Sequence, residues 1–258
     1  METRILVAPG DGTTVLESQL PPEEPYAGWV WVDVLVCDAD LEELVDLTAG
    51  LRLDAVALRD AVDDIDLPKV DDFGHHLLVI LHGLRDDRVE TYELDCFAAE
   101  RHLVTVRRLP SPALEALWSQ IQERPELALG GVDELVARLA DVLTRRLLAV
   151  VDAFDERVDG LVEKALGADP HLLAELTAVR GDLAAVRRVV HPQREVLDLL
   201  RRSTSPLVGD AGRRRFSDVF DVASRTAQGL DAGRSALAEI SMPIEVRKPA
   251  RRPMSPRS

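Results

Sequence analysis

The sequence of 258 residues has no long apolar run, and this absence excludes a chain that crosses a membrane by itself. A membrane-spanning helix needs about 20 mostly apolar residues, whereas the apolar runs here, such as residues 77–81, are strand-sized. The N-terminus also lacks the basic and then apolar pattern of a signal peptide. We therefore expect a cytoplasmic chain that reaches a membrane only through helices that this sequence does not contain.

Cysteines and catalytic motifs are equally scarce. The two cysteines, Cys37 and Cys96, lie among apolar residues and are predicted to be buried, reduced thiols. His75 and His76 are adjacent on a predicted strand, so their side chains point to opposite faces, and neither has a partner at a zinc-ligand spacing. Because the sequence also has no nucleophile elbow and no phosphate-binding loop, we do not expect an enzyme.

Negative charge dominates the chain, whose net charge is −15. Residues 33–100 hold 19 acidic and five basic side chains, and such a field repels phosphate backbones and attracts cations. Binding of DNA or RNA is therefore not expected. Residues 241–258 have the opposite sign, with five basic residues, one glutamate and four prolines, and this composition predicts a disordered tail.

The first half of the chain alternates short strands with short helices. Short runs of apolar and β-branched residues predict strands at 3–8, 13–16, 29–36, 77–84, 90–99 and 102–107. Two short helices are predicted at 40–49, between the N-cap Asp40 and Gly50, and at 55–62. The last three strands are joined by tight polar turns and must be antiparallel neighbours. We predict a mixed or antiparallel sheet that is covered by helices, an αβα sandwich.

The second half is helical. Apolar residues at helical spacing predict a helix over 131–166, about 50 Å long at 1.5 Å per residue. A second long helix with a four-three apolar repeat follows, and a last helix over 213–240 is ended by Pro243. The fold class is therefore α+β. We expect three regions, namely a sheet domain at 1–130, long antiparallel helices at 131–240 and the tail at 241–258.

Several acidic clusters are candidates for binding a hard divalent cation. Mg²⁺ keeps most of its waters and touches only one or two carboxylates, so its sites are sparse and can be shared between chains. Asp86 and Asp87 lie in a tight turn after a predicted buried strand, and Asp218 and Asp221 lie three residues apart on one helical face. Each cluster taken alone, like the aspartates within residues 63–72, also fits a solvated surface.

Five segments resemble the motifs of one protein family, in the order and spacing of that family. They are Trp31-Val32-Asp33, the helix segment at 57–62 (Ala-Leu-Arg-Asp-Ala-Val), the turn at 67–73 (Leu-Pro-Lys-Val-Asp-Asp-Phe), and the segments at 191–197 (His-Pro-Gln-Arg-Glu-Val-Leu) and 216–221 (Phe-Ser-Asp-Val-Phe-Asp). The turn is the most specific of them. On these residues most of the chain resembles the cytoplasmic part of the CorA family of divalent-cation, chiefly magnesium, transporters.

The resemblance implies a funnel-like homopentamer in which an αβα sandwich carries long helices and the last helix continues as a stalk. It also implies regulatory Mg²⁺ between neighbouring subunits, which holds the closed state, with Zn²⁺ and Co²⁺ as alternative cations. By the resemblance, Asp87 and Asp218 take the positions of two aspartates that bind the same ion. Asp141 falls at the position of an aspartate of a second site. Asp86 precedes Asp87 in the same turn, and Asp221 follows Asp218 on the same helix.

The resemblance stops after residue 240. There the family continues into a longer stalk, two membrane helices and a Gly-Met-Asn signature, and none of these follows in this sequence. With its stalk helix truncated, the chain is expected to be the regulatory domain of a magnesium transporter, with weak Mg²⁺ binding and a weakened pentamer, and not to conduct ions itself.

Other functions stay open at this point. A zinc-transporting relative of the same fold would share all the motifs above. A soluble acidic scaffold that binds partners through its helices would share the composition and sense no metal. A metal-dependent hydrolase would need a base, a nucleophile and metal ligands that converge, and the sequence shows no such set.

Overall fold

The computed structural model of the chain describes residues 1–17, 28–36, 41–85, 89–166 and 171–246. Within these residues seven strands form one sheet, in the order β2-β1-β3-β7-β6-β5-β4. The strands are β1 (Glu2–Ala8), β2 (Val15–Glu17), β3 (Trp29–Leu35), β4 (Lys69–Asp72), β5 (His76–Leu84), β6 (Thr91–Ala99) and β7 (His102–Arg107). The β3–β7 pair is parallel and the other pairs are antiparallel, so the sheet is mixed, and the predicted antiparallel order of the last three strands is confirmed.

β4 is a strand that the sequence did not predict. Its residues pair antiparallel with β5, and Lys69 lies opposite Ile80. The prediction of a turn over residues 67–73 was therefore wrong. The chain turns one step later, where Gly74 adopts a φ of 83° and its N–H donates to Asp72 Oδ1 at 2.7 Å. Charged residues suit this strand because it is at the edge of the sheet, with one side toward water.

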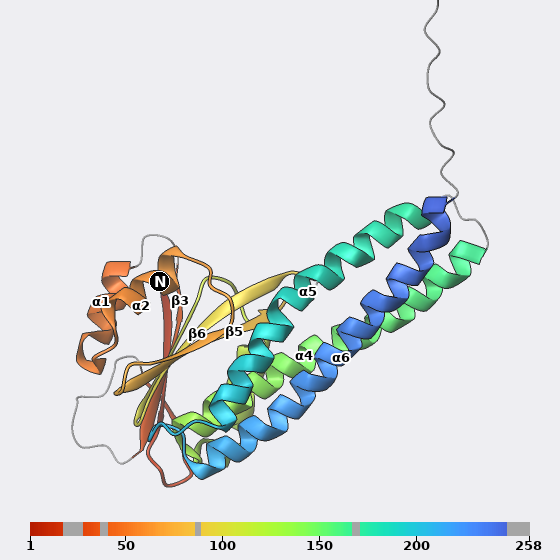
Figure 1. Cartoon of the computed structure of the whole chain (residues 1–258). Coiled ribbons are helices and arrows are strands. Elements are labelled where there is room, and N and C mark those ends of the chain that lie inside the picture. The colour runs from red at the N-terminus through yellow and green to blue at the C-terminus, as the bar shows by residue number, and fades with distance from the viewer. Residues whose placement is uncertain (18–27, 37–40, 86–88, 167–170, 247–258) are drawn as a thin grey trace, which may run out of the picture.

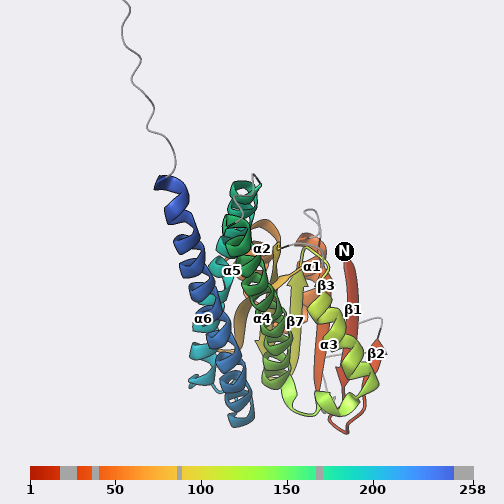
Figure 2. The ribbon, with the colours of Figure 1, turned by 90° about the vertical axis from the view of Figure 1, so that its right-hand side faces the viewer.

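Helices cover both faces of the sheet, since successive side chains of a strand point to opposite sides. On β1, Ile5 and Val7 share a core with residues of the helices at 41–48 and 55–63, whereas Leu6 and Ala8 share a core with the helix at 112–123 and the start of the helix at 131–166. Figures 1 and 2 show these two layers on opposite sides of the sheet. The predicted αβα sandwich is confirmed. The helices are α1 (Leu41–Thr48), η1 (Ala49–Leu51), α2 (Ala55–Asp63), α3 (Pro112–Glu123), η2 (Pro125–Ala128), α4 (Gly131–Leu166), α5 (Leu172–Arg201) and α6 (Asp210–Val246).

Three long helices, α4, α5 and α6, each antiparallel to the next in sequence, form an arm that extends away from the sheet (Figure 1). The arm has a core of its own, to which Phe154 of α4, Leu183 of α5 and Leu230 of α6 contribute. α4 has the predicted bounds. α6 runs on to Val246, so the prediction that Pro243 ends it was wrong. A proline removes one N–H donor from a helix, but the residues after it can keep helical dihedral angles for a further turn.

The Trp31-Val32-Asp33 segment has a structural role. Asp33 is 1% exposed, and its carboxylate accepts hydrogen bonds from Arg107 Nη2 at 2.9 Å and Thr105 Oγ1 at 2.8 Å. Arg4 Nε donates a third, at 2.8 Å. A buried carboxylate is tolerated only when such partners replace its water. Asp33 therefore joins β1, β3 and β7 from inside the sandwich.

The predicted environments of Cys96 and the two histidines are confirmed. Cys96 is a buried free thiol, while Cys37 lies outside the described residues. His76 is fully buried and stacks on Phe73 with ring centroids 4.7 Å apart, whereas the neighbouring His75 is exposed. Cys96 and His76 are therefore part of the packed interior, and His75 is on the surface.

Candidate functional site

Two of the five candidate aspartates lie at one pocket. Asp141 is on α4 and Asp218 is on α6, and the two helices pack together through buried residues such as Leu139 and Val219. Both aspartates line a pocket of about 280 Å³, which is closed on one side by α3. Helix packing therefore brings together two carboxylates from distant parts of the sequence.

Arginine side chains balance the charge of this pocket. Arg145 Nε donates to both carboxylate oxygens of Asp141, at 2.9 and 2.8 Å, and this hydrogen bonding raises the pKa of the Arg145 guanidinium. Arg215 Nε donates to Glu134, and Arg138 is the third arginine, with its pKa lowered by burial and by the charge of Arg215. Three arginines thus line the pocket beside two aspartates, so in one copy of the chain its negative charge is already neutralised.

Unlike Asp141, Asp218 and Asp221 have no arginine partner among the described residues. Both are exposed on α6, three residues apart and thus on one side of the helix. In the part of the chain that the structure describes, neither carboxylate has a hydrogen bond or an ion pair. Asp221 does not line the pocket, so the structure groups Asp218 with Asp141 and leaves Asp221 on the outer surface.

The remaining two candidates, Asp86 and Asp87, lie outside the described residues. The residues on either side of them belong to the β5–β6 connection, in which Arg85 N–H donates to Glu90 O at 3.1 Å. Leu84 joins the same core cluster as Leu147 of α4 and Ala227 of α6, which are six and nine positions beyond Asp141 and Asp218. The flank of the turn is therefore packed against the arm.

No group of three or more His, Cys, Asp or Glu side chains arranged to hold a metal occurs among the described residues. A Mg²⁺ ion takes six oxygen ligands, several of them water. Asp141 and Asp218 can supply only some of these six oxygen atoms. The others must come from water or from residues outside this pocket.

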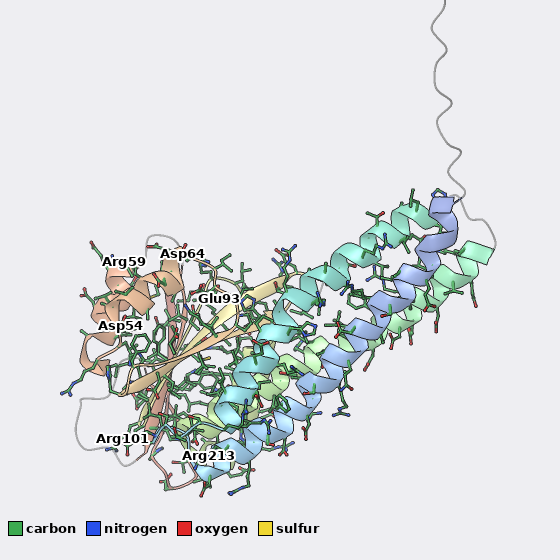
Figure 3. The ribbon with its side chains drawn as sticks, in the orientation of Figure 1. Asp54, Arg59, Asp64, Glu93, Arg101 and Arg213 are labelled. Carbon is green, nitrogen blue, oxygen red and sulfur yellow. The ribbon has the colours of Figure 1, made fainter. Side chains whose placement is uncertain are left out.

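A second acidic group, which the sequence analysis did not single out, lies under α2. Glu93 and Asp95 alternate on β6 and so point to the same face of the sheet. Both line a cavity of about 220 Å³ together with His82, and Figure 3 shows Glu93 within the sheet region. Asp66 N–H donates to Glu93 Oε2 at 2.9 Å, and Asp66 O lies 2.7 Å from His82 Nε2.

Burial governs the protonation of this cluster. Burial raises the pKa of Glu93 to about 7, and it raises the pKa of Asp95, which is 2% exposed, well above its ordinary value. Their mutual repulsion adds to the shift of Asp95. Burial lowers the pKa of His82. The cavity therefore favours neutral side chains, which suits structural packing and opposes cation binding. Polar residues at alternate positions of an otherwise apolar strand were the sequence signal for it.

Solved structures share this fold. The soluble domain of CorA from Methanocaldococcus jannaschii superposes with a TM-score of 0.81 at 17% identity, covering 93% of this chain and 95% of that one. The cytoplasmic domain of ZntB from Vibrio parahaemolyticus gives a TM-score of 0.78 at 14% identity, covering 95% and 98%. At such identities the likeness shows the fold alone, an αβα sandwich followed by long helices.

Sequence comparison goes further and shows the family. The chain belongs to the family of CorA-like Mg²⁺ transporter proteins, whose family model matches residues 26–245. It is 22% identical over 223 residues to YfjQ of Bacillus subtilis, described by its name as a metal ion transporter, covering 84% of this chain and 68% of YfjQ. It is 22% identical over 195 residues to the cobalt/magnesium transport protein CorA of M. jannaschii, covering 74% of this chain. That match spans 61% of the M. jannaschii protein, which is less than two thirds of its length.

Two further findings bear on function. The family is one of transporters and not of enzymes, in agreement with the expectation from the sequence. Among the helices of the described residues, none combines the length and the apolar character that crossing a bilayer requires.

Proposed function

We propose that this chain is the regulatory part of a CorA-like magnesium transporter, and that Mg²⁺ bound between neighbouring copies at the Asp218 surface favours the assembled, closed state. The observation that carries the proposal is the pair of exposed, unpartnered carboxylates of Asp218 and Asp221, beside a pocket that Asp218 shares with Asp141. Family membership supports the choice of a divalent cation.

The geometry favours a site that is shared between copies. Asp141 is already hydrogen-bonded to Arg145, so within one chain Asp218 and Asp221 are the carboxylates at this surface that are ready to accept an ion. A hydrated Mg²⁺ held by one or two carboxylates from each of two chains meets its need for oxygen without a dedicated cage. The candidate partner is the turn at Asp86 and Asp87 of a neighbouring copy.

The chemistry of the donors favours Mg²⁺ over Zn²⁺. Carboxylate oxygen suits hard cations, whereas a zinc site of high affinity draws on Cys and His. Among the described residues, no His or Cys lines the pocket of Asp141 and Asp218. The fold shared with ZntB keeps a zinc-transporting function as the second candidate, and cobalt, which the name of the M. jannaschii relative carries, as a third cation to compare.

Calorimetric titration of the whole chain with Mg²⁺ tests the site. We expect affinity in the high micromolar to millimolar range, as for an ion that keeps most of its water, and loss of the signal in Asp218→Asn. The matched control is Asp152→Asn, which removes an exposed carboxylate of α4 outside the pocket and should leave binding unchanged. Equal binding by the wild type and Asp218→Asn would remove Asp218 from the site. No heat with any divalent cation would favour an acidic scaffold.

A further inference from the structure

A groove with basic walls lies between α5 and α6, on the arm. It has a volume of about 600 Å³, which lies in the range of small-molecule sites. Its floor is apolar, with Leu183 and Leu237 among the contributing residues. The helices approach closely here because α6 has Gly233, where a Cβ atom would come within 3.3 Å of Leu183 Cδ1. The basic residues that line the groove are Arg180, Arg187, Arg188 and His191 of α5 and Arg234 of α6.

The concentration of positive charge is unusual for this chain. The protein carries a net charge of −15, yet four arginines and a histidine line one groove. Asp231 of α6 approaches two of them, with Oδ1 at 3.5 Å from Arg187 Nε and 3.6 Å from His191 Nε2. Among the described residues, Arg188 and Arg234 have no ion pair.

Guanidinium groups that line one groove carry like charges, and an anion bound between them offsets their repulsion. Their planar forks of N–H donors match the oxygen atoms of phosphate and form bidentate, charge-assisted hydrogen bonds. Arginines on both walls suit a ligand with more than one phosphate group. The apolar floor suits the rest of such a ligand, for example a flat ring.

We propose that the groove between α5 and α6 binds a small, soluble ligand that carries at least two phosphate groups, in the manner of a nucleoside polyphosphate. The ligand would link the two helices through Arg187 and Arg188 on one wall and Arg234 on the other. Asp231 acts as an internal counter-ion that the ligand displaces. Asp218 lies 16 residues before Arg234 on α6, about 24 Å along the helix, so the groove is separate from the cation surface and does not depend on it.

Calorimetric titration of the whole chain with ATP, pyrophosphate and orthophosphate, in buffer without divalent cations, tests the proposal. We expect ATP and pyrophosphate to bind and orthophosphate to bind more weakly, because it reaches fewer guanidinium groups. Replacing Arg187 and Arg188 together by alanine should weaken ATP binding by about tenfold or more, since two charge-assisted contacts are lost. The matched control is Arg59→Ala, which removes an exposed arginine of α2 at the far end of the molecule from the arm (Figure 3).

A second variant tests whether Asp231 competes with the ligand for the arginines of the groove. Asp231→Asn removes the competing carboxylate, so ATP should bind severalfold more tightly than to the wild type. Thermal melting of each variant checks that it is folded. Absence of ATP and pyrophosphate binding, or equal ATP affinity in the wild type and the double arginine variant, would overturn the proposal. So would binding to phosphatidylglycerol-containing vesicles, but not to phosphatidylcholine vesicles or to the soluble phosphates, because that result assigns the groove to a lipid headgroup.

Discussion

Within α4, Arg145 Nε donates hydrogen bonds to both carboxylate oxygens of Asp141, at 2.9 and 2.8 Å. The two residues are four positions apart, so they are neighbours on the same face of the helix. Both line the pocket that Asp218 also lines. A cation that uses Asp141 must therefore first displace an internal one, and this competition lowers its affinity.

The first prediction follows from this competition. Arg145→Gln removes the internal cation and one positive charge from the pocket, so Mg²⁺ affinity should rise by about two- to tenfold, in line with the modest strength of an exposed ion pair. Calorimetric titration measures it. Arg225→Gln, an exposed change on α6 outside the pocket, serves as the control. Unchanged affinity in Arg145→Gln would show that Asp141 is not a ligand.

The second prediction concerns the pH dependence of stability. Burial in the folded protein raises the pKa values of Glu93 and Asp95, so folding favours their protonated forms. The pKa of Glu93 rises from 4.5 to about 7. Their contribution to stability is present below their unfolded pKa values and is lost as the pH rises through about 7. For the pair we expect on the order of 1–2 kcal/mol, allowing for partial solvent access to Glu93.

Thermal melting across the pH range measures this contribution. Asp95→Asn keeps a neutral side chain at every pH, so the decline in melting temperature between pH 5 and pH 8 should become shallower. Asp46→Asn, an exposed change on α1, should keep the wild-type slope. The buried His82 and the half-buried His102, whose pKa values are lowered, act in the opposite sense, because their contribution is lost as the pH falls below 6.5. A slope identical in Asp95→Asn and the wild type would contradict the assignment.

The third prediction assigns Asp33 to the fold and not to cation binding. Asp33→Ala leaves Arg107, which is 7% exposed, without its main partner, and this should cost about 3 kcal/mol of unfolding free energy. Glu115→Ala removes an outer partner of the same arginine that is 49% exposed, and should cost less than about 1 kcal/mol. Urea denaturation compares the two. Costs of similar size would contradict the network described here.

Local patterns were enough to predict most elements. The apolar period of 131–166 predicted α4, and tight polar joints predicted the order of β5, β6 and β7, because both depend on neighbouring residues. β4 was missed because its acidic sequence is typical of a turn, and it becomes a strand only by pairing with β5. The parallel pairing of β3 with β7 likewise depends on contacts between distant segments.

The features of the candidate sites also differ in whether they depend on neighbouring residues or on packing between distant segments. Asp141 and Asp218 were chosen by family resemblance, and their shared pocket exists only because α4 packs on α6. The pairing of Asp141 with Arg145 is a local, four-residue relationship that the sequence alone could have revealed. The basic groove could not have been predicted, because Arg234 reaches the α5 arginines only after the two helices dock.

Sedimentation velocity with and without Mg²⁺ tests the central claim most directly, since an ion held between copies stabilises their assembly by mass action. In chelator the chain should sediment as a monomer or a weak oligomer, and millimolar Mg²⁺ should shift it to larger species. Asp218→Asn should stay in the small form at the same Mg²⁺ concentration, while Asp152→Asn should assemble like the wild type. An oligomer of the same size with chelator and with Mg²⁺, unaffected by Asp218→Asn, would contradict cation binding between subunits.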